Sequence, residues 1–315
     1  MNFSTKVPIQ VSLNQISYES KIVSFGSCFA ENIAQKFDYY KFQNIVNPFG
    51  IIFNTVSIHN IIDRIINQKL FTVDDIFFHN HSWHCFDVHS NLSNSDKEIL
   101  LNNLNEILKS TQQQIIDCSH FIITYGTSWA YKTKENNQVV ANCHKMSQKH
   151  FTKHLLSANE NEIAIEKTIS IIKSINPNVK LIFTISPVRH IKDGFRENNV
   201  SKSNLISALD NIISKNPSID YFPSYEIVLD ELRDYRFYRS DMLHPNEIAI
   251  DYIWQRFTES IIDVDVLNIM IAIENIQKMM NHKSNNEQSQ QNQELKSKIQ
   301  EKIQQLQQKY PSLIF

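Results

Sequence analysis

The stretch Lys21-Ile22-Val23-Ser24-Phe25-Gly26-Ser27-Cys28-Phe29-Ala30 decides the fold. It opens with a short apolar run that ends at Gly26, and apolar residues then recur at Ile33, Phe37 and Tyr40 with helical spacing. This pattern predicts a strand, a tight turn and a helix. The glycine gives the turn room to bring a substrate close to the backbone.

The same alternation continues along the chain. Apolar runs predict strands, amphipathic runs predict helices, and Pro245 is expected at the first position of the last of these helices. Strands that are apolar throughout indicate a parallel sheet covered on both faces, so we expect a three-layer α/β/α sandwich. Residues 75–88, rich in aromatics and histidines, predict a hairpin or an irregular loop. The further strands are expected at residues 42–46, 121–125, 180–186 and 220–221. The helices are expected at residues 55–68, 95–116, 160–175, 201–214 and 245–257.

The domain is expected to span residues 1–260, followed by a helical, Gln- and Lys-rich tail over 261–315. From Asn281 to Gln308 the composition is polar, with a rough helical spacing of Leu295, Ile299, Ile303 and Leu306. We interpret this tail as a solvated helix or a partly disordered segment, with self-association through the helix as the alternative. Its composition offers little apolar area to bury, so the sequence predicts that it is dispensable for chemistry.

Composition excludes several classes of function. The formal net charge of −2 gives no basic footprint for nucleic acid. No apolar stretch reaches the roughly 18–20 residues of a membrane helix, and Met1 to Gln10 lacks the layout of a signal peptide. The four cysteines form no Cys-x-x-Cys pair, which favours a reduced, cytoplasmic protein. Only 4 glycines are present, too few for a phosphate loop, and we expect no cofactor.

Two short motifs could carry chemistry together. A nucleophile at Ser27 or Cys28 would lie between a strand end and a helix start, where free backbone N–H groups stabilise an oxyanion. Asp241 precedes His244 by three residues, so its carboxylate could orient the imidazole as a general base. Each motif alone is explained more readily by an ordinary turn, but their order along the chain, nucleophile first and Asp-x-x-His last, is that of SGNH hydrolases.

The chain resembles the GSCFA-domain family, named for the residues Gly26-Ser27-Cys28-Phe29-Ala30. The resemblance covers about residues 3–258 and implies the SGNH/GDSL hydrolase superfamily, with its flavodoxin-like sheet. The other matching stretches are Asn47-Pro48-Phe49-Gly50-Ile51, Trp83-His84-Cys85-Phe86-Asp87, Tyr125-Gly126-Thr127-Ser128-Trp129, Asn142-Cys143-His144-Lys145, Ser186-Pro187-Val188-Arg189-His190 and Asp241-Met242-Leu243-His244-Pro245.

The resemblance implies roles for individual residues. His244 matches the superfamily histidine, with Asp241 as its orienting group, and the N–H of Gly50 matches an oxyanion donor. The superfamily asparagine is missing after the strand at 121–125, so either Ser128 or Asn142 would donate in its place, or the oxyanion hole is weaker. Loss of one such donor costs about 3 kcal/mol in other enzymes.

The nucleophile also departs from the superfamily pattern Gly-Asp-Ser. Aligned without a gap, Cys28 takes the place of the serine, and we favour it, while Ser27 is the alternative if the turn is shifted by one residue. A thiolate near a helix N-terminus and a histidine is expected to have a lowered pKa. A thioester intermediate transfers readily to other acceptors, which raises the prospect of acyl transfer beside hydrolysis.

Further polar and aromatic residues in these stretches are expected to bind substrate, with Arg189 as an anion holder whose ordinary alternative is a salt bridge. They are His84, His89, Trp129, His144, Arg189 and His190. The group of His79, His81, His84, His89, Cys85 and Asp87 has enough ligands for a metal, but its spacing is irregular, and we expect ordinary loop or pocket residues and no metal.

The predicted function is an ester hydrolase or acyltransferase acting on an O-acyl substrate, with a small molecule or glycan as its partner. The carbohydrate part rests on analogy with the superfamily. The alternative is a catalytically inactive SGNH scaffold that binds a glycan or a protein. A metal-dependent hydrolase using the histidine group is a third, less favoured reading.

Overall fold

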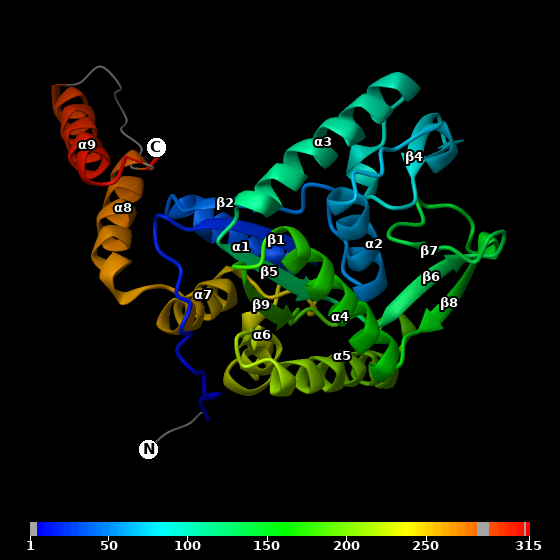
Figure 1. Cartoon of the computed structure of the whole chain (residues 1–315). Helices are drawn as coiled ribbons and strands as arrows, with labels where there is room; N and C mark the ends of the chain where they lie inside the picture. The colour runs from blue at the N-terminus through cyan, green and yellow to red at the C-terminus, as the bar shows by residue number, and fades with distance from the viewer. Residues whose placement is uncertain (1–4, 282–289, 312) are drawn as a thin grey trace.

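The computed structural model describes residues 5–281, 290–311 and 313–315. Five parallel strands form the central sheet, in the order β10-β9-β5-β1-β2 (Figure 1). The mainly parallel α/β sheet predicted from the sequence is therefore confirmed. The strands are β1 (Lys21–Gly26), β2 (Gln43–Val46), β5 (His120–Tyr125), β9 (Lys180–Ile185) and β10 (Asp220–Phe222).

Helices cover the sheet and extend beyond it. No helix in the described part of the chain is both long and apolar enough to cross a membrane. In Figure 1, α8 and α9 lie together at one end of the molecule. The helices are α1 (Cys28–Tyr39), α2 (Thr55–Ile66), α3 (Lys97–Asp117), α4 (Ala158–Ile175), α5 (Phe195–Lys215), the short α6 (Ser224–Glu226), α7 (Glu247–Ile261), α8 (Leu267–Met280) and α9 (Gln290–Lys309).

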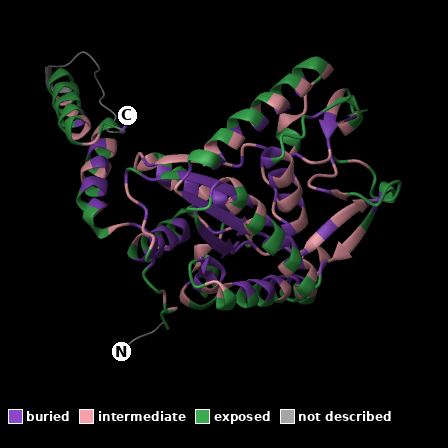
Figure 2. Cartoon of the chain, in the orientation of Figure 1, coloured by how far each residue is buried: buried purple, intermediate pink, exposed green. Residues whose placement is uncertain are grey.

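Alternate residues of the strands feed two separate apolar clusters, because successive side chains of a strand point to opposite faces. Ile22 and Ile122 pack against α1 and α7, whereas Val23 and Phe121 pack against α2, α3, α4 and α5. Figure 2 shows buried residues concentrated in the central strands and on the inner faces of the helices. The fold is a three-layer sandwich, as the sequence predicts.

Two small antiparallel units project from the sandwich. β3 (Ile76–His79) and β4 (Ser82–Cys85) form the hairpin that was one of two expectations for residues 75–88. A second sheet, in the order β7-β6-β8, was not predicted. It consists of β6 (Trp129–Thr133), β7 (Val139–Val140) and β8 (Phe151–Leu155).

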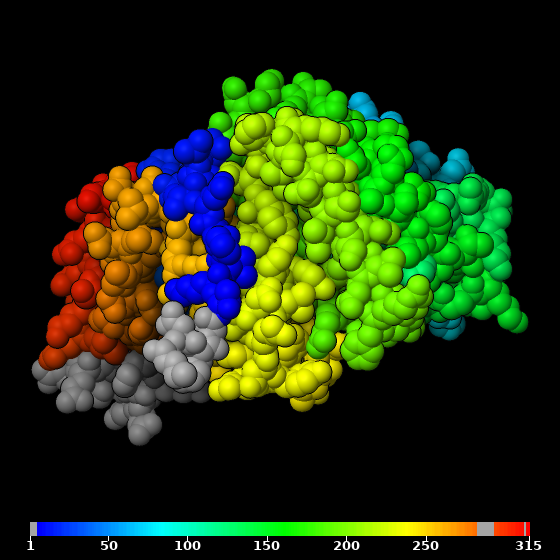
Figure 3. Space-filling view, turned by 90° about the horizontal axis from the view of Figure 1, so that it is seen from below, coloured from blue at the N-terminus to red at the C-terminus, as the bar shows by residue number. Residues whose placement is uncertain are grey.

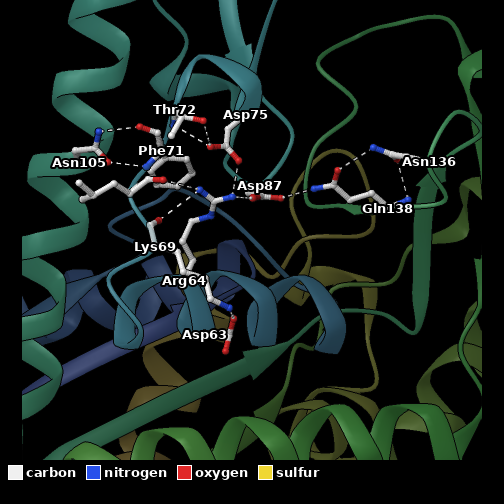
Figure 4. A network of polar contacts seen from close by, with 11 residues as sticks. Asp63, Arg64, Lys69, Phe71, Thr72, Asp75, Asp87, Asn105, Asn136 and Gln138 are labelled. Carbon is white, nitrogen blue, oxygen red and sulfur yellow. Dashed lines mark hydrogen bonds and ion pairs between the residues drawn. The ribbon is translucent and has the colours of Figure 1, made fainter.

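A polar network anchors the hairpin unit to α2 (Figure 4). The guanidinium of Arg64 lies 2.6 Å from a carboxylate oxygen of Asp75 and 3.3 Å from one of Asp87, and it stacks on the Phe71 ring at 4.3 Å. Gln138, next to β7, donates to Asp87 at 3.4 Å. One cation on α2 thus ties together the loop before β3, the loop after β4 and the β6–β8 unit.

Side-chain caps fix where the helices begin. Asn246 is the N-cap of α7, and its side-chain oxygen accepts from the N–H of Ala249 at 3.1 Å. The prediction that Pro245 occupies the first position of this helix is therefore wrong. Pro245 instead makes an isolated bridge to Tyr238, and the helix starts after an asparagine that satisfies one of its free N–H groups.

The N-terminal segment runs along the surface beside α7 (Figure 3). The N–H groups of Ser12 and Ile16 donate to the carbonyls of Ser260 and Ile261 at 2.8 and 2.7 Å, and Ile16 is completely buried. These contacts extend the apolar layer that α1 and α7 form under the sheet.

The C-terminal residues also join this layer, contrary to the expectation that they bury little apolar area. Leu313 is 1 % exposed, Ile303 is buried, and the Tyr310 ring lies 6.1 Å from the Tyr18 ring. A helix from 290 to 309 agrees with the predicted helical tail, while its stretch at 282–289 lies outside the described residues. The helical spacing of the apolar residues predicted the helix. It did not predict that the aromatic and aliphatic residues after the helix belong to the core.

Truncating Leu313 tests whether these residues stabilise the domain. We expect Leu313→Ala to lower the free energy of unfolding by about 2–3 kcal/mol, because a buried leucine loses its apolar contacts. Ile314, 80 % exposed, is the matched control, and Ile314→Ala should leave the denaturation midpoint unchanged. Equal midpoints for both variants would restore the interpretation of a solvated tail.

Candidate active site

The turn between β1 and α1 has room for glycine only. Gly26 has a φ of +144°, and a Cβ there would lie 2.2 Å from the carbonyl oxygen of Thr124. The N–H of Gly26 donates to the side-chain oxygen of Asn47 at 2.8 Å, and the N–H of Ser27 donates to Thr124 at 3.1 Å. The turn is thereby fixed to the neighbouring strands, and α1 begins directly at Cys28.

Ser27 and Cys28 differ in how accessible they are. Ser27 is 2 % exposed, and its hydroxyl oxygen accepts from the N–H of Phe29 at 3.3 Å as the N-cap of α1. Cys28 is the first residue of the helix and is partly exposed. Of the two candidate nucleophiles, the thiol is the one that a substrate can reach.

The pKa of the Cys28 thiol is raised, not lowered as the sequence suggested. Burial is the largest cause, and the carboxylate of Glu31 adds to it. The N–H groups at the start of α1 and the positive charge of Lys202 lower the pKa, but they do not offset burial. The resting thiol is protonated at neutral pH, so its use as a nucleophile requires a base.

Asp241 and His244 form a hydrogen-bonded pair, as their spacing predicts. Nδ1 of His244 lies 2.6 Å from one carboxylate oxygen of Asp241, and the other oxygen accepts from the N–H groups of Leu243 and His244 at 2.9 and 3.0 Å. These donors hold the pKa of Asp241 at about 2, so the carboxylate is charged at neutral pH. A carboxylate on Nδ1 favours a proton there and leaves Nε2 as an acceptor.

The loop that carries this pair is tied to the end of β9. Arg189 donates from Nη2 to the carbonyl of Met242 at 3.2 Å, and its guanidinium stacks on the Tyr238 ring at 5.3 Å. Among the hydrogen bonds of the described residues, none joins His244 to Ser27 or Cys28. In the described part of the chain, the candidate base and the candidate nucleophiles are thus not joined by a hydrogen bond.

His190 follows β9 on the loop that also carries Arg189. Its ring stacks on Phe53 at 5.6 Å, and burial, followed by the charges of Lys202 and His244, lowers its pKa to about 4. Its Nε2 is buried and has no hydrogen-bond partner among the described residues. The ring is neutral at physiological pH and electrostatically close to both the buried lysine and the catalytic candidate His244.

Lys202 is a residue of this region that the sequence analysis missed. It is 1 % exposed, and its Nζ donates to the carbonyls of Gly126 at 2.7 Å and Ser186 at 2.6 Å. Burial lowers its pKa to about 7. A signal was available, because Lys202 falls three and seven residues before Leu205 and Leu209 on the buried stripe of α5.

Two of the three predicted oxyanion donors, Gly50 and Ser128, already donate to carbonyls of the protein. The N–H of Gly50 donates to the carbonyl of Asn47 at 2.7 Å, which closes a turn. Ser128 is fully buried and donates its hydroxyl to the carbonyl of Ser201 at 2.7 Å, so this hydroxyl already has an acceptor inside the protein. The side-chain oxygen of Asn142 accepts from the N–H of His144 at 2.8 Å within its own loop.

The histidines predicted to bind substrate hold loops together instead. Both ring nitrogens of His84 have partners, Ser93 at 2.6 Å and the carbonyl of His79 at 2.9 Å. His144 is buried, contacts the carbonyl of Cys85 at 2.7 Å, and has a pKa lowered to about 4, chiefly by burial. Internal contacts thus occupy both ring nitrogens of His84 and Nε2 of His144, while Nδ1 of His144 is buried without a hydrogen-bond partner among the described residues. Substrate binding by either ring stays a prediction.

His89 and Trp129, two further residues predicted to bind substrate, each contact a polar group of the protein. Nδ1 of His89 accepts from the N–H of Asn91 at 3.4 Å. The Trp129 ring lies under the Lys153 ammonium at 4.5 Å. In residues 5–281, 290–311 and 313–315, no group of three or more His, Cys, Asp or Glu side chains is placed to hold a metal ion.

A small pocket lies against the loop of the Asp241–His244 pair. Its volume is about 260 Å³, and Arg189 contributes a wall from the end of β9. The other lining residues come from the segment before that loop: Val228, Leu229, Arg233, Asp234, Tyr235 and Tyr238. Two arginines and two tyrosines make it suited to a polar or anionic group of a ligand.

Comparison with known proteins assigns the chain to a family. Residues 21–257 match the model described as the GSCFA family, and residues 273–315 match the model described as the C-terminal domain of GSCFA domain proteins. No curated protein matches the chain. The first match includes the β1–α1 turn, Lys202 and the Asp241–His244 pair and covers well over half of the sequence. The chain therefore belongs to the GSCFA family.

Proposed function

We propose that this protein is an ester hydrolase or acyltransferase of the SGNH type, in which Cys28 is the nucleophile and His244 the general base. The observation that carries the proposal is the Asp241–His244 hydrogen bond at 2.6 Å, which directs Nε2 of the imidazole to accept a proton. The partly exposed thiol of Cys28 at the start of α1 supports it.

In the proposed reaction, Nε2 of His244 takes the proton of the Cys28 thiol. The sulfur attacks the acyl carbonyl, the ester C–O bond breaks, and the imidazolium returns the proton to the leaving oxygen. Water or an acceptor hydroxyl then attacks the thioester, again losing its proton to His244, and the thiol is regenerated. Water as acceptor gives hydrolysis and a hydroxyl group gives transfer.

The charge that develops on the acyl oxygen needs donors. The N–H groups at the start of α1 lower the pKa of the Cys28 thiol and so favour negative charge there, which supports an oxyanion position beside the sulfur; of these groups, the N–H of Phe29 also donates to the Ser27 hydroxyl. The loop that carries His244 is more exposed than the strand ends. In the proposed reaction this loop moves toward Cys28 when substrate binds, because catalytic hydrogen bonds often tighten only in the complex.

The substrate proposed is a small molecule or glycan that carries an O-acyl group. Carbohydrate is the class suggested by the superfamily, and the pocket beside Arg189 and Tyr238 supports a polar or anionic group next to the acyl site. We further propose a cytoplasmic location and chemistry without a cofactor. Turnover that chelators abolish would contradict the latter.

Separate substitutions at the two nucleophile positions are expected to give opposite results. Cys28→Ala should reduce hydrolysis of p-nitrophenyl acetate to background, whereas Ser27→Ala should retain much of it, because the Ser27 hydroxyl is buried as a helix cap. Iodoacetamide should inactivate the wild type and Ser27→Ala alike. The reverse pattern would assign the nucleophile to Ser27.

A catalytically inactive scaffold that binds a glycan or a protein partner is the second candidate. The raised thiol pKa, the buried Ser128 and the absence of a hydrogen bond from His244 to Cys28 within the described residues favour it. It predicts glycan or partner binding that His244→Ala leaves intact and no ester turnover in any variant. Self-association through α9 is a separate proposal, tested by the oligomer size of a chain truncated at residue 281.

A further inference from the structure

The pocket beside the Asp241–His244 loop, about 260 Å³ in volume, is lined by side chains that donate more hydrogen bonds than they accept. Arg189 and Arg233 contribute guanidinium groups, which only donate. The hydroxyls of Tyr235 and Tyr238 can also donate, and within the described part of the chain neither hydroxyl has a hydrogen-bond partner. A ligand that fits this lining has to supply acceptor atoms.

Arg233 is an exposed arginine of this lining. Among residues 5–281, 290–311 and 313–315, its guanidinium finds no hydrogen bond, ion pair or aromatic contact. The carboxylate of Asp234, which also lines the pocket, is already occupied by Arg236, whose Nη2 donates to it at 2.9 Å and whose backbone N–H donates to it at 2.8 Å. Arg236 thus neutralises Asp234, and the charge of Arg233 stays uncompensated in the pocket.

Arg189 is held in place by neutral groups, so its charge remains available to a ligand. Its Nη2 donates to the carbonyl of Met242 at 3.2 Å, and its guanidinium lies over the Tyr238 ring at 5.3 Å. Its Nε is buried and has no hydrogen-bond partner among the described residues, which is costly for a donor of a charged group. A guanidinium grips a carboxylate or phosphate with two parallel N–H donors, and Arg189 is oriented in advance for such a group.

The wall of the pocket and the proposed general base belong to one loop. Tyr238 forms a bridge with Pro245, and the N–H of Arg239 donates to the carbonyl of His244 at 2.8 Å. Arg189 contacts the same loop at Met242, two residues before His244. An anionic group bound in the pocket therefore lies beside the residues that carry His244.

We propose that this pocket is an anion subsite that binds a carboxylate or phosphate group of the substrate through Arg189 and Arg233, with the hydroxyls of Tyr235 and Tyr238 as further donors. The substrate class then narrows to O-acyl compounds that carry such an anionic group. This assignment to the substrate rests on the function proposed above, whereas anion binding at the two arginines does not.

The first test is calorimetric titration with inorganic phosphate at constant ionic strength, because salt screens exposed charges. Arg233→Gln should weaken phosphate binding by about tenfold, the usual contribution of one charge-assisted hydrogen bond. Arg196→Gln is the matched control, because Arg196 is an exposed arginine on α5, away from the pocket lining, and it should bind phosphate like the wild type. Equal affinities in wild type and Arg233→Gln would overturn the proposal.

Asp234→Asn should act in the opposite direction. Asp234 caps the short helix at Tyr235–Phe237, and an asparagine oxygen can accept the same hydrogen bond from the N–H of Arg236. The substitution removes a negative charge from the pocket and frees the Arg236 guanidinium, so phosphate should bind severalfold more tightly. Unchanged or weaker binding by this variant would count against the anion subsite.

Ester turnover distinguishes an anionic group of the substrate from free phosphate. The wild type should hydrolyse p-carboxyphenyl acetate with a higher kcat/KM than phenyl acetate, and Arg233→Gln should lower this ratio by about tenfold. Phosphate binding with an unchanged ratio would overturn the assignment to the substrate. Phosphate binding without turnover of either ester would contradict the proposed function and leave the anion site standing, while turnover of both esters without phosphate binding would do the reverse.

Discussion

Replacing His244 with alanine is expected to reduce ester turnover by roughly 10²–10⁴-fold, the usual contribution of a positioned general acid–base. The loss should fall on kcat, because the side chain is proposed to act on the proton and not on substrate binding. Asp241→Asn should lose a comparable amount. An amide in place of the oxygen at 2.6 Å from Nδ1 would donate a proton there and push the imidazole toward the wrong tautomer.

The chain contains a matched control for this pair. His154 lies 2.8 Å from Glu160, and its side chain is 40 % exposed, against 39 % for His244. His154→Ala breaks an equally exposed histidine–carboxylate pair between β8 and the first turn of α4, and turnover should be unchanged. Steady-state kinetics on p-nitrophenyl acetate measure both variants. If His154→Ala and His244→Ala lose activity equally, the effect is not one of general base catalysis.

Replacing Arg64 with methionine is expected to lower the free energy of unfolding by about 3–5 kcal/mol, the cost of leaving a buried charge without its partner. Asp87 is the main cause, because its side chain is more buried than that of Asp75 and burial already raises its pKa. Urea denaturation measures the loss. Lys69→Met, which breaks the exposed pair with Asp63, should cost less than about 1 kcal/mol.

The Arg64 variant also has a definite pH dependence. The Asp87 pKa is raised in the fold, so ionisation of this buried carboxyl opposes folding as pH rises, and more so without Arg64. The Asp75 pKa is lowered with Arg64 as a cause, so the stability that Asp75 gains is lost as pH falls. Both effects make the difference between wild type and variant shrink on acidification. A difference that grows toward low pH would contradict this explanation.

Much of the fold was predictable because local pattern and burial agree. The runs at Lys21–Gly26 and His120–Tyr125 are apolar on both faces, and only a covered parallel sheet buries both. The β6–β8 unit was not predicted, since strands of intermediate burial such as Trp129–Thr133 carry a mixed pattern. Its position depends on contacts with distant segments that spacing does not encode.

The sequence predicted the contacts of the site between residues that are close together in the chain. It did not predict the contacts between distant residues or the effects of burial. The Asp241–His244 contact joins residues three positions apart on one loop, so the motif predicts it. The hydrogen bonds of Ser128 with Ser201 and of Lys202 with Gly126 join residues more than seventy positions apart. The pKa of Cys28 was predicted in the wrong direction because the sequence showed the helix N-terminus but not the burial.

The location of Leu313 has a consequence for the order in which the protein is made. The apolar cluster on the Val23 face draws its members from residues up to Tyr225, whereas the cluster on the Ile22 face includes Leu313. During synthesis the cluster on the Val23 face can therefore form before the cluster on the Ile22 face is complete, because Leu313 lies much later in the sequence than Tyr225. The apolar layer on the Ile22 face is therefore largely covered once α1 and α7 have been made, but it is complete only when Leu313 has been added, and until then the nascent chain exposes part of this layer.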